Sequence, residues 1–224
     1  MKVRSILSIL KPYPILRQWG FLCCFFVGIA YLQAQKVTTK SWEATPYKVI
    51  EILSKDAYQI NISTSPRENI LLQMETEGEH ASEVVLETFI KGDTLALQTA
   101  FRPFFQAEND KLAAHKVISI KLTLELPERL QVFVNAYKAH VFTIGTFQKV
   151  QLDLKLGNAL LREFSGNARI HSWEGDIEVW AQPNVLGKGL SKYGEVKSEL
   201  LVGRHPNIIA ESVKGNISLR KTPD

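Results

Sequence analysis

Carboxylates and aromatic side chains gather in one short segment, and these are the residue types that could do chemistry here. Glu174, Asp176 and Glu178 alternate along the segment, and Trp173 and Trp180 flank it. Paired carboxylates are what glycoside hydrolysis needs, and clusters of oxygen ligands are what calcium needs. Exposed tryptophans could stack on sugar rings or anchor a partner protein. These five residues are therefore the candidate interaction face.

Each of these functional interpretations has a structural alternative, one for the carboxylates and one for the tryptophans, and the sequence favours the structural alternative in both cases. Basic residues on neighbouring repeat steps could neutralise the carboxylates through cross-strand ion pairs and leave an ordinary solvated face. These bases are Lys155, Arg162, Arg169, Lys188, Lys192 and Lys197. Buried tryptophans would line or cap the hydrophobic core, as aromatic residues on strands more often do.

No catalytic signature accompanies this segment. The sequence contains no nucleophile elbow, no phosphate-binding glycine-rich loop and no zinc-ligand spacing. The five histidines form no pair at metal-ligand spacing, and both cysteines, Cys23 and Cys24, lie in the apolar N-terminal run. We therefore predict that the protein is not an enzyme and has no catalytic residue, cofactor or metal site.

The first 35 residues differ from the rest of the chain. Four basic residues and no acidic one precede an uninterrupted apolar run from Phe21 to Leu32. A basic start, a short apolar run and a small residue after it are typical of a secretory signal peptide. An uncleaved membrane anchor within residues 20–33 is the alternative. With either leader we expect an exported protein, located in the periplasm, in the cell envelope or outside the cell.

The charge balance excludes one class of partner. The chain has 27 Lys and Arg against 23 Asp and Glu, so removing the four bases of the leader leaves 23 against 23. A neutral mature region lacks the basic surface that nucleic-acid binding requires. We expect no nucleic-acid partner, contact with the membrane only through an uncleaved N-terminal segment, and a protein or glycan partner at the cell envelope.

Period-two alternation runs through the sequence after the leader and predicts an all-β fold. Apolar and polar residues alternate from Ile118 to Leu126, and Pro127 ends that strand because proline cannot donate to a strand ladder. After the leader, no stretch places apolar residues at helical spacing for more than about two turns. We expect an N-terminal β-sheet or sandwich-like region over residues 36–127.

A turn signal recurs through the C-terminal half: a glycine, then a polar residue, then an apolar one. It occurs at Gly157-Asn158-Ala159, Gly166-Asn167-Ala168, Gly175-Asp176-Ile177, Gly194-Glu195-Val196 and Gly215-Asn216-Ile217, with glycines 9, 9, 19 and 21 residues apart. Two steps, each of a strand of about five residues and a turn of about four, make a coil of about 18 to 21 residues. The pattern predicts a β-solenoid-like (β-helix) stack with Gly-Asn/Asp corners over residues 128–221. An evenly spaced β-meander is the alternative.

These residues also carry a resemblance to a known family. A strand that ends in proline, Leu122 to Pro127, leads into a second strand, Leu130 to Ala136, and the glycine steps follow. This order resembles the putative adhesin head domain of bacterial envelope proteins, a domain of unknown function common in Bacteroidetes-type secreted proteins. Ala139 stands where that family has its first glycine. The resemblance implies adhesion by analogy, and a shared fold alone does not establish a function.

Together these observations predict a non-enzymatic, secreted or cell-envelope, adhesin-like protein that serves interaction or scaffolding. One alternative is a β-helix protein that binds or degrades envelope polysaccharide through Glu174, Asp176 and Glu178. The other is a periplasmic sensor partner held at the membrane by its N-terminal segment.

Overall fold

The computed structural model describes residues 35–105 and 118–223, and these residues are all-β. Apart from Gln35, the predicted leader and its alternative membrane anchor lie outside the described residues. The helical structure in the described ranges is one short 3-10 turn, η1 (Ala81–Glu83). No helix in these ranges is long and apolar enough to cross a membrane. The all-β prediction is confirmed.

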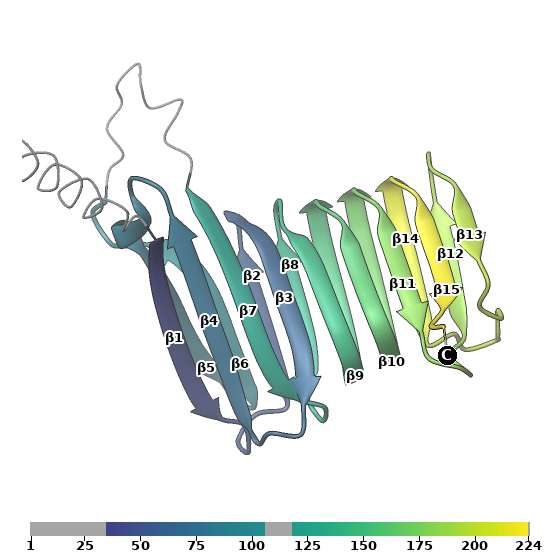
Figure 1. Ribbon diagram of the computed structural model, residues 1–224, viewed down its shortest axis with the longest axis horizontal. Helices are drawn as coiled ribbons and strands as arrows, with labels where there is room; N and C mark the ends of the chain where they lie inside the picture. Colours follow the sequence, from purple (N-terminus) through teal and green to yellow (C-terminus); the bar gives the residue numbers. More distant parts are fainter. Residues whose placement is uncertain (1–34, 106–117, 224) are drawn as a thin grey trace, which may run out of the picture. The chain divides into compact units, whose positions relative to one another are not determined.

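The strands form one continuous hydrogen-bonded sheet that folds over itself into a front and a rear layer (Figure 1). The front layer contains, in spatial order, β1 (Gln35–Glu43), β4 (Asn69–Glu77), β7 (Ser119–Pro127), β3 (Ala57–Ser65), β9 (His140–Leu156), β10 (Ala159–Glu174), β11 (Ile177–Ala181), β15 (Ile217–Lys221) and β13 (Val196–Ser198). The rear layer contains β5 (Val84–Lys91), β6 (Thr94–Phe101), β2 (Val49–Ser54), β8 (Gln131–Ala136), β9, β10, β14 (Ile208–Lys214) and β12 (Gly187–Ser191).

β9 and β10 belong to both layers because each of them bends near its middle. The first half of β9 pairs with β3 and its second half with β8, and β10 likewise pairs first with β11 and then with β14. Gly145 and Gly166 lie at the bends, with φ of +110° and +118°. Glycine adopts this backbone conformation without a steric penalty. A Cβ atom at Gly166 would also overlap the carbonyl oxygen of Phe147.

Side chains that point inward from both layers fill one hydrophobic core. In β7, the alternation predicted from Ile118 to Leu126 buries Ile120, Leu122, Leu124 and Leu126, and the strand ends at Pro127 as expected. Near the bends, the rings of Phe147 and Phe164 stack with their centroids 6.0 Å apart.

Neighbouring strands in most of the sheet run parallel at the spacing that the sequence predicts. Ala159 on β10 pairs with Val141 on β9 and with Ile177 on β11, each 18 residues away. Antiparallel pairs join β1 to β4 and β4 to β7 in the front layer, and β5 to β6 in the rear layer. The predicted separation of about 18 residues is therefore found between β9, β10 and β11, and the sheet does not by itself show a β-solenoid.

Two coils lie out of chain order, one toward each end of the stack. The β2–β3 coil lies between β6–β7 and β8–β9, because β2 pairs with β6 and β8 while β3 pairs with β7 and β9. The β14–β15 coil lies between β10–β11 and β12–β13 for the corresponding reason. A solenoid wound strictly in sequence would place each coil directly on the one before it.

Four of the five predicted corner glycines stack in a column along one edge of the two layers, while the fifth, Gly166, lies at the bend within β10. A Cβ atom at Gly175 would overlap the carbonyl of Gly157, one at Gly215 would overlap that of Gly175, and one at Gly194 would overlap that of Gly215. The spatial order 157, 175, 215, 194 again shows that the last coil is inserted between two earlier ones.

A ladder of polar side chains runs beside this glycine column. Asn158 Oδ1 accepts a hydrogen bond from the Asp176 N–H at 2.9 Å, and Asp176 Oδ1 accepts one from the Asn216 N–H at 2.7 Å. Asn216 Oδ1 then accepts from the Glu195 N–H at 2.9 Å. Each Asn or Asp therefore satisfies a backbone donor of the neighbouring corner, which accounts for the polar residue in the repeat.

Candidate binding groove

The five candidate residues do not lie on one face, because a corner divides them. Trp173 and Glu174 end β10 in the rear layer, Asp176 lies in the corner, and Glu178 and Trp180 belong to β11 in the front layer. The three carboxylates therefore do not alternate along a single strand.

Each of these carboxylates has a partner within the chain. Glu174 Oε2 lies 3.6 Å from Lys214 Nζ, across the paired strands β10 and β14. Asp176 belongs to the corner ladder, and Glu178 Oε1 accepts a hydrogen bond from Trp180 Nε1 at 2.7 Å. One of these three contacts is a cross-strand ion pair, and its base, Lys214, is not among the six bases named from the sequence.

The two tryptophans have different surroundings. Trp180 is half-buried on the outer side of β11, with the Arg220 guanidinium carbon 5.0 Å from the centre of its ring system. Trp173 is 49% exposed. The interpretation that the tryptophans line the core is wrong, because neither belongs to the buried cluster. Both point outward, since Ser172 and Val179 beside them take the inward positions.

Trp173 lines a groove of about 800 Å³ on the outer side of the rear layer. The groove crosses five parallel neighbours, β6, β2, β8, β9 and β10, near their C-terminal ends. Its residues come from segments that are far apart in the sequence and are brought together by strand pairing.

The strand register explains why these side chains meet. One row of paired, buried residues crosses β2, β8, β9 and β10: Ser54, Ala136, Leu154 and Ser172. The next residue along the chain, which still belongs to β9 or β10 and directly follows the end of β2 or β8, points to the opposite side. These next residues form an exposed row of alternating basic and aromatic side chains, here called the lysine–aromatic row: Lys55, Tyr137, Lys155 and Trp173.

The lysine–aromatic row is open to solvent and has its charges available. Tyr137 is 48% exposed, and Lys155 Nζ lies over its ring, 5.5 Å from the centroid. Among the described residues, no carboxylate lies within ion-pair distance of Lys55 or Lys155. A ligand could therefore meet both ammonium groups without displacing an internal ion pair.

Polar side chains form a second row along the groove, two residues before the lysine–aromatic row on β8, β9 and β10 and continuing onto β6. Its polar members are Gln98, Asn135, Asp153 and His171. His171 Nδ1 lies 3.2 Å from Asp153 Oδ1. Ser54 and Thr99 share a buried hydrogen bond of 2.7 Å at the groove. The groove thus offers donors and acceptors beside its aromatic rings.

The sequence analysis identified only one member of the lysine–aromatic row, Trp173. Tyr137, Lys155 and Trp173 recur at one coil period, since Asp153 and His171 on the same strands pair at a separation of 18 residues. That periodic signal could have identified Tyr137 and Lys155. Lys55 gives no such signal, because its coil lies out of chain order.

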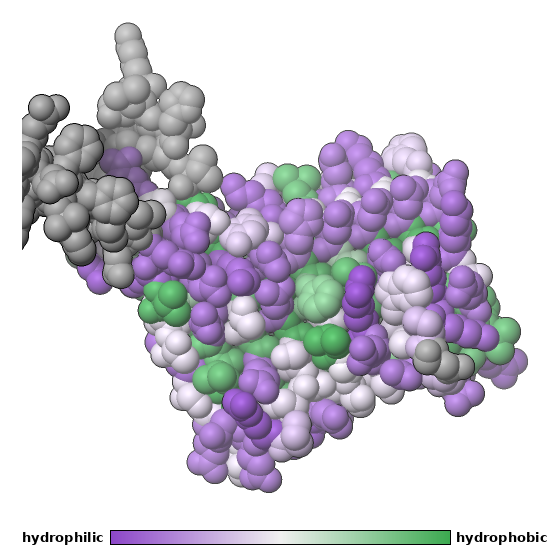
Figure 2. All heavy atoms as spheres, in the orientation of Figure 1, coloured by the Kyte–Doolittle hydropathy of each residue, from purple (hydrophilic) through white to green (hydrophobic). Residues whose placement is uncertain are grey.

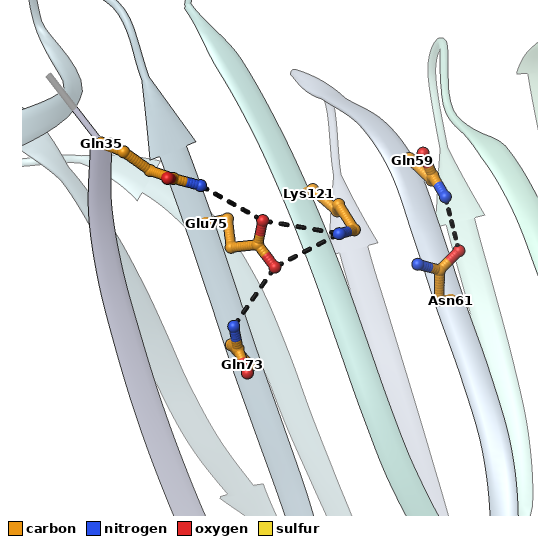
Figure 3. A network of polar contacts seen from close by, with 6 residues as sticks. All are labelled: Gln35, Gln59, Asn61, Gln73, Glu75 and Lys121. Atoms are coloured by element: carbon orange, nitrogen blue, oxygen red, sulfur yellow. Dashed lines mark hydrogen bonds and ion pairs between the residues drawn. The ribbon is translucent and has the colours of Figure 1, made fainter.

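The outer face of the front layer carries a network in which polar groups pair with one another. Figure 3 shows its members: Gln35, Gln59, Asn61, Gln73, Glu75 and Lys121. Glu75 accepts hydrogen bonds from Gln35, Gln73 and Lys121, at 3.3, 3.2 and 3.2 Å. Gln59 Nε2 donates to Asn61 Oδ1 at 2.8 Å. These polar groups therefore hydrogen-bond mainly to one another, which leaves few of them free to contact a ligand.

Figure 2 shows this front face as polar over much of its surface, with a small apolar group near its middle. Half-buried Phe142, Ile144 and Leu160 point outward from β9 and β10 in this layer. A depression of about 330 Å³ lies beside Phe142 and Ile144, smaller than the groove of the rear layer. Within residues 35–105 and 118–223, no group of three or more His, Cys, Asp or Glu side chains could hold a metal ion.

Comparison with known proteins gives a match at the level of the fold. No protein-family model matches the sequence, and no curated protein matches it. The fold is similar to that of a putative cell adhesion protein from Clostridium sporogenes, with a TM-score of 0.63 and 12% identity over 84% of this chain and 99% of that chain. The adhesin-like fold implied by the glycine steps is thereby confirmed.

Two further solved structures match less closely. One is a putative adhesin from Bacteroides fragilis, with a TM-score of 0.35 and 16% identity over 83% of this chain and 97% of that chain. The other is a putative lipid binding protein from Parabacteroides distasonis, with a TM-score of 0.40 and 13% identity over 82% of each chain.

Proposed function

We propose that this protein is an exported, non-enzymatic, adhesin-like protein of the cell envelope that binds its partner in the groove of the rear layer. The observation that carries the proposal is the lysine–aromatic row, with two half-exposed rings in a concave site. Binding sites typically combine exposed aromatic surface with a few polar groups that fix orientation. The similar fold of a protein described as a putative cell adhesion protein supports the same role.

We also propose that residues 128–221 act as a β-solenoid-like scaffold that follows an N-terminal β-sheet region over residues 36–127. The parallel register, the glycine column and the polar ladder support this description. The scaffold presents equivalent positions of successive coils side by side, so that residues one period apart line one groove. Binding by surface complementarity along such a row needs no cofactor.

Export is proposed from the basic and apolar leader alone. N-terminal sequencing of the protein recovered from the producing cells tests it. A mature chain that starts near Lys36 supports a cleaved signal peptide, and an intact N-terminus in the membrane fraction supports an anchor within residues 20–33. Recovery of the intact chain from the cytoplasm contradicts export.

Binding of the purified, labelled protein to isolated cell envelopes tests the groove. Trp173→Ala removes a ring of the lysine–aromatic row, and we expect it to weaken binding by about tenfold. Trp180→Ala is the matched control, because it removes the same side chain from the outer side of the other layer. Equal binding by both variants and the parent protein would show that the groove is not the binding site.

A further inference from the structure

We infer that the groove binds an acidic oligosaccharide, a chain of sugar rings of which at least one carries a carboxylate. This inference rests on the proposed function and adds the chemical class of the ligand. It is carried by the alternation of ammonium groups and aromatic rings at the C-terminal ends of four adjacent strands.

The aromatic members suit sugar rings. One face of a pyranose ring exposes C–H bonds and packs against the face of an aromatic ring, while its hydroxyl groups point to the sides. Tyr137 directly follows β8 and Trp173 belongs to β10, and β9 lies between these two strands. Adjacent strands are about 4.8 Å apart, so the backbones that carry the two rings are about 10 Å apart. That separation favours a chain of sugars over a single one.

The lysines suit a carboxylate on the chain. Lys55 directly follows β2 and Lys155 belongs to β9, and these two strands lie on either side of β8, which Tyr137 follows. Lys155 Nζ lies over the Tyr137 ring, so a sugar that stacks there takes the place of this ammonium group. A carboxylate on that sugar would then lie near Lys55 on one side and the displaced Lys155 on the other. Charge-assisted hydrogen bonds of this kind are stronger than neutral ones. Because neither lysine has a carboxylate partner among the described residues, no internal ion pair opposes the contact.

The second row suits hydroxyl groups. A sugar hydroxyl both donates and accepts, and the groove offers amides from Gln98 and Asn135 together with the Asp153 carboxylate and the His171 imidazole. A mixture of donors and acceptors at one wall matches a ligand that presents several hydroxyls.

Stacked rings and lysines can also bind single-stranded nucleic acid, but the acidic residues of the groove disfavour it. Asp56 and Asp153 line the groove beside the two lysines. A nucleic acid brings one negative charge with every phosphate and is held by a continuous basic surface. An oligosaccharide with fewer charges fits a wall on which carboxylates and ammonium groups are mixed.

Isothermal titration with defined hexasaccharides tests the ligand class. The acidic probes are oligogalacturonate, a hyaluronan fragment and an alginate fragment, and the comparison probes are neutral cellohexaose and single-stranded hexathymidylate. We expect at least one acidic probe to bind about tenfold more tightly than cellohexaose, because a carboxylate adds a charge-assisted contact. The difference should shrink as salt is raised, since the contact is exposed.

Variants assign the contacts to the groove. Lys155→Gln should weaken binding of the acidic probe about fivefold and leave that of any neutral sugar unchanged. Lys192→Gln is the matched control, because Lys192 Nζ lies 5.1 Å from the ring of Tyr193 in the terminal coil, in the same kind of contact. Thermal unfolding of both variants checks that they fold like the parent protein.

The outcomes separate this inference from the proposed function. Equal affinity for acidic and neutral sugars, tighter binding of hexathymidylate, or no sugar binding at all overturns the acidic oligosaccharide. In the last case, loss of envelope binding in Trp173→Ala would still support the groove as the binding site. If Trp173→Ala also binds envelopes normally, both the ligand class and the proposed function are wrong.

Discussion

The outer faces of the two layers are built from the same alternating strands, yet their polar side chains differ in what they contact. In front, Glu75 is held by Gln35, Gln73 and Lys121 (Figure 3). In the rear, Lys155 contacts the ring of Tyr137 and has no carboxylate partner among the described residues.

This difference indicates which face can bind a partner. A polar group already paired inside the chain must give up that contact before it contacts a ligand, so its net gain is small. An exposed ring such as Trp173, or an ammonium group whose internal contact is with an aromatic ring and not with a carboxylate, gives up less. We therefore expect the rear groove, and not the network around Glu75, to bind a partner.

The largest effect is expected from a substitution at the bend of β10, the strand that belongs to both layers. Gly166→Ala would place a Cβ against the Phe147 carbonyl at a bend shared by both layers. We expect the free energy of unfolding to fall by at least about 3 kcal/mol, with loss of groove binding. Urea denaturation measures the change in the free energy of unfolding.

Gly92→Ala is the control for this substitution. Gly92 also has a positive φ, +61°, but a Cβ there would meet nothing within 4 Å. The strained backbone alone should cost about 1 kcal/mol. If Gly92→Ala and Gly166→Ala cost the same, the close approach to Phe147 does not matter, and the bend is less constrained than the structure indicates.

An intermediate loss of stability is expected from a substitution in the polar ladder beside the glycine column, at the corners where the two layers meet. Asp176→Ala removes the acceptor of the Asn216 N–H, and we expect it to lower the free energy of unfolding by about 1 to 2 kcal/mol. Glu195→Ala at the end of the ladder should cost less than about 0.5 kcal/mol, because among the described residues its exposed carboxylate pairs only with Lys197, two residues along the chain. Equal costs measured by thermal unfolding would mean that the ladder contributes nothing.

The smallest effect is expected from a substitution in the front-face network, and it can be compared directly with one in the rear groove. Lys121→Met removes the 3.2 Å ion pair with Glu75, whose carboxylate keeps Gln35 and Gln73 as donors. We expect less than about 1 kcal/mol of lost stability and unchanged envelope binding. Weakened envelope binding in Lys121→Met, measured beside Lys155→Gln, would place a binding site on the front face.

Features encoded by local repetition could be predicted from the sequence. Gly157 and Gly175 mark corners because the close approach of stacked turns excludes a side chain, and Pro127 ends β7. The alternation of inward and outward positions along β10 also predicts that Trp173 is exposed. Ile170 and Ser172 point inward, so the residue that follows must point outward, against the usual preference of tryptophan.

The stacking order could not be predicted in the same way. A period of 18 to 21 residues shows that coils match in length, and coils of equal length can pair with one another in any order. Gly215 lies between Gly175 and Gly194 in space although it follows both in sequence. Likewise, Lys55 joins Tyr137 only because β2 pairs with β8. Such contacts depend on long-range pairing, which leaves no local signal.

The most direct test of the groove compares two double variants in binding to isolated cell envelopes. Tyr137→Ala with Trp173→Ala removes both rings of the lysine–aromatic row, and Trp180→Ala with Tyr193→Ala removes two rings outside it. We expect the first double variant to lose about fiftyfold in affinity and the second to bind like the parent protein. Equal affinities of the two folded variants, or a larger loss in the second, would contradict a binding site in the rear groove.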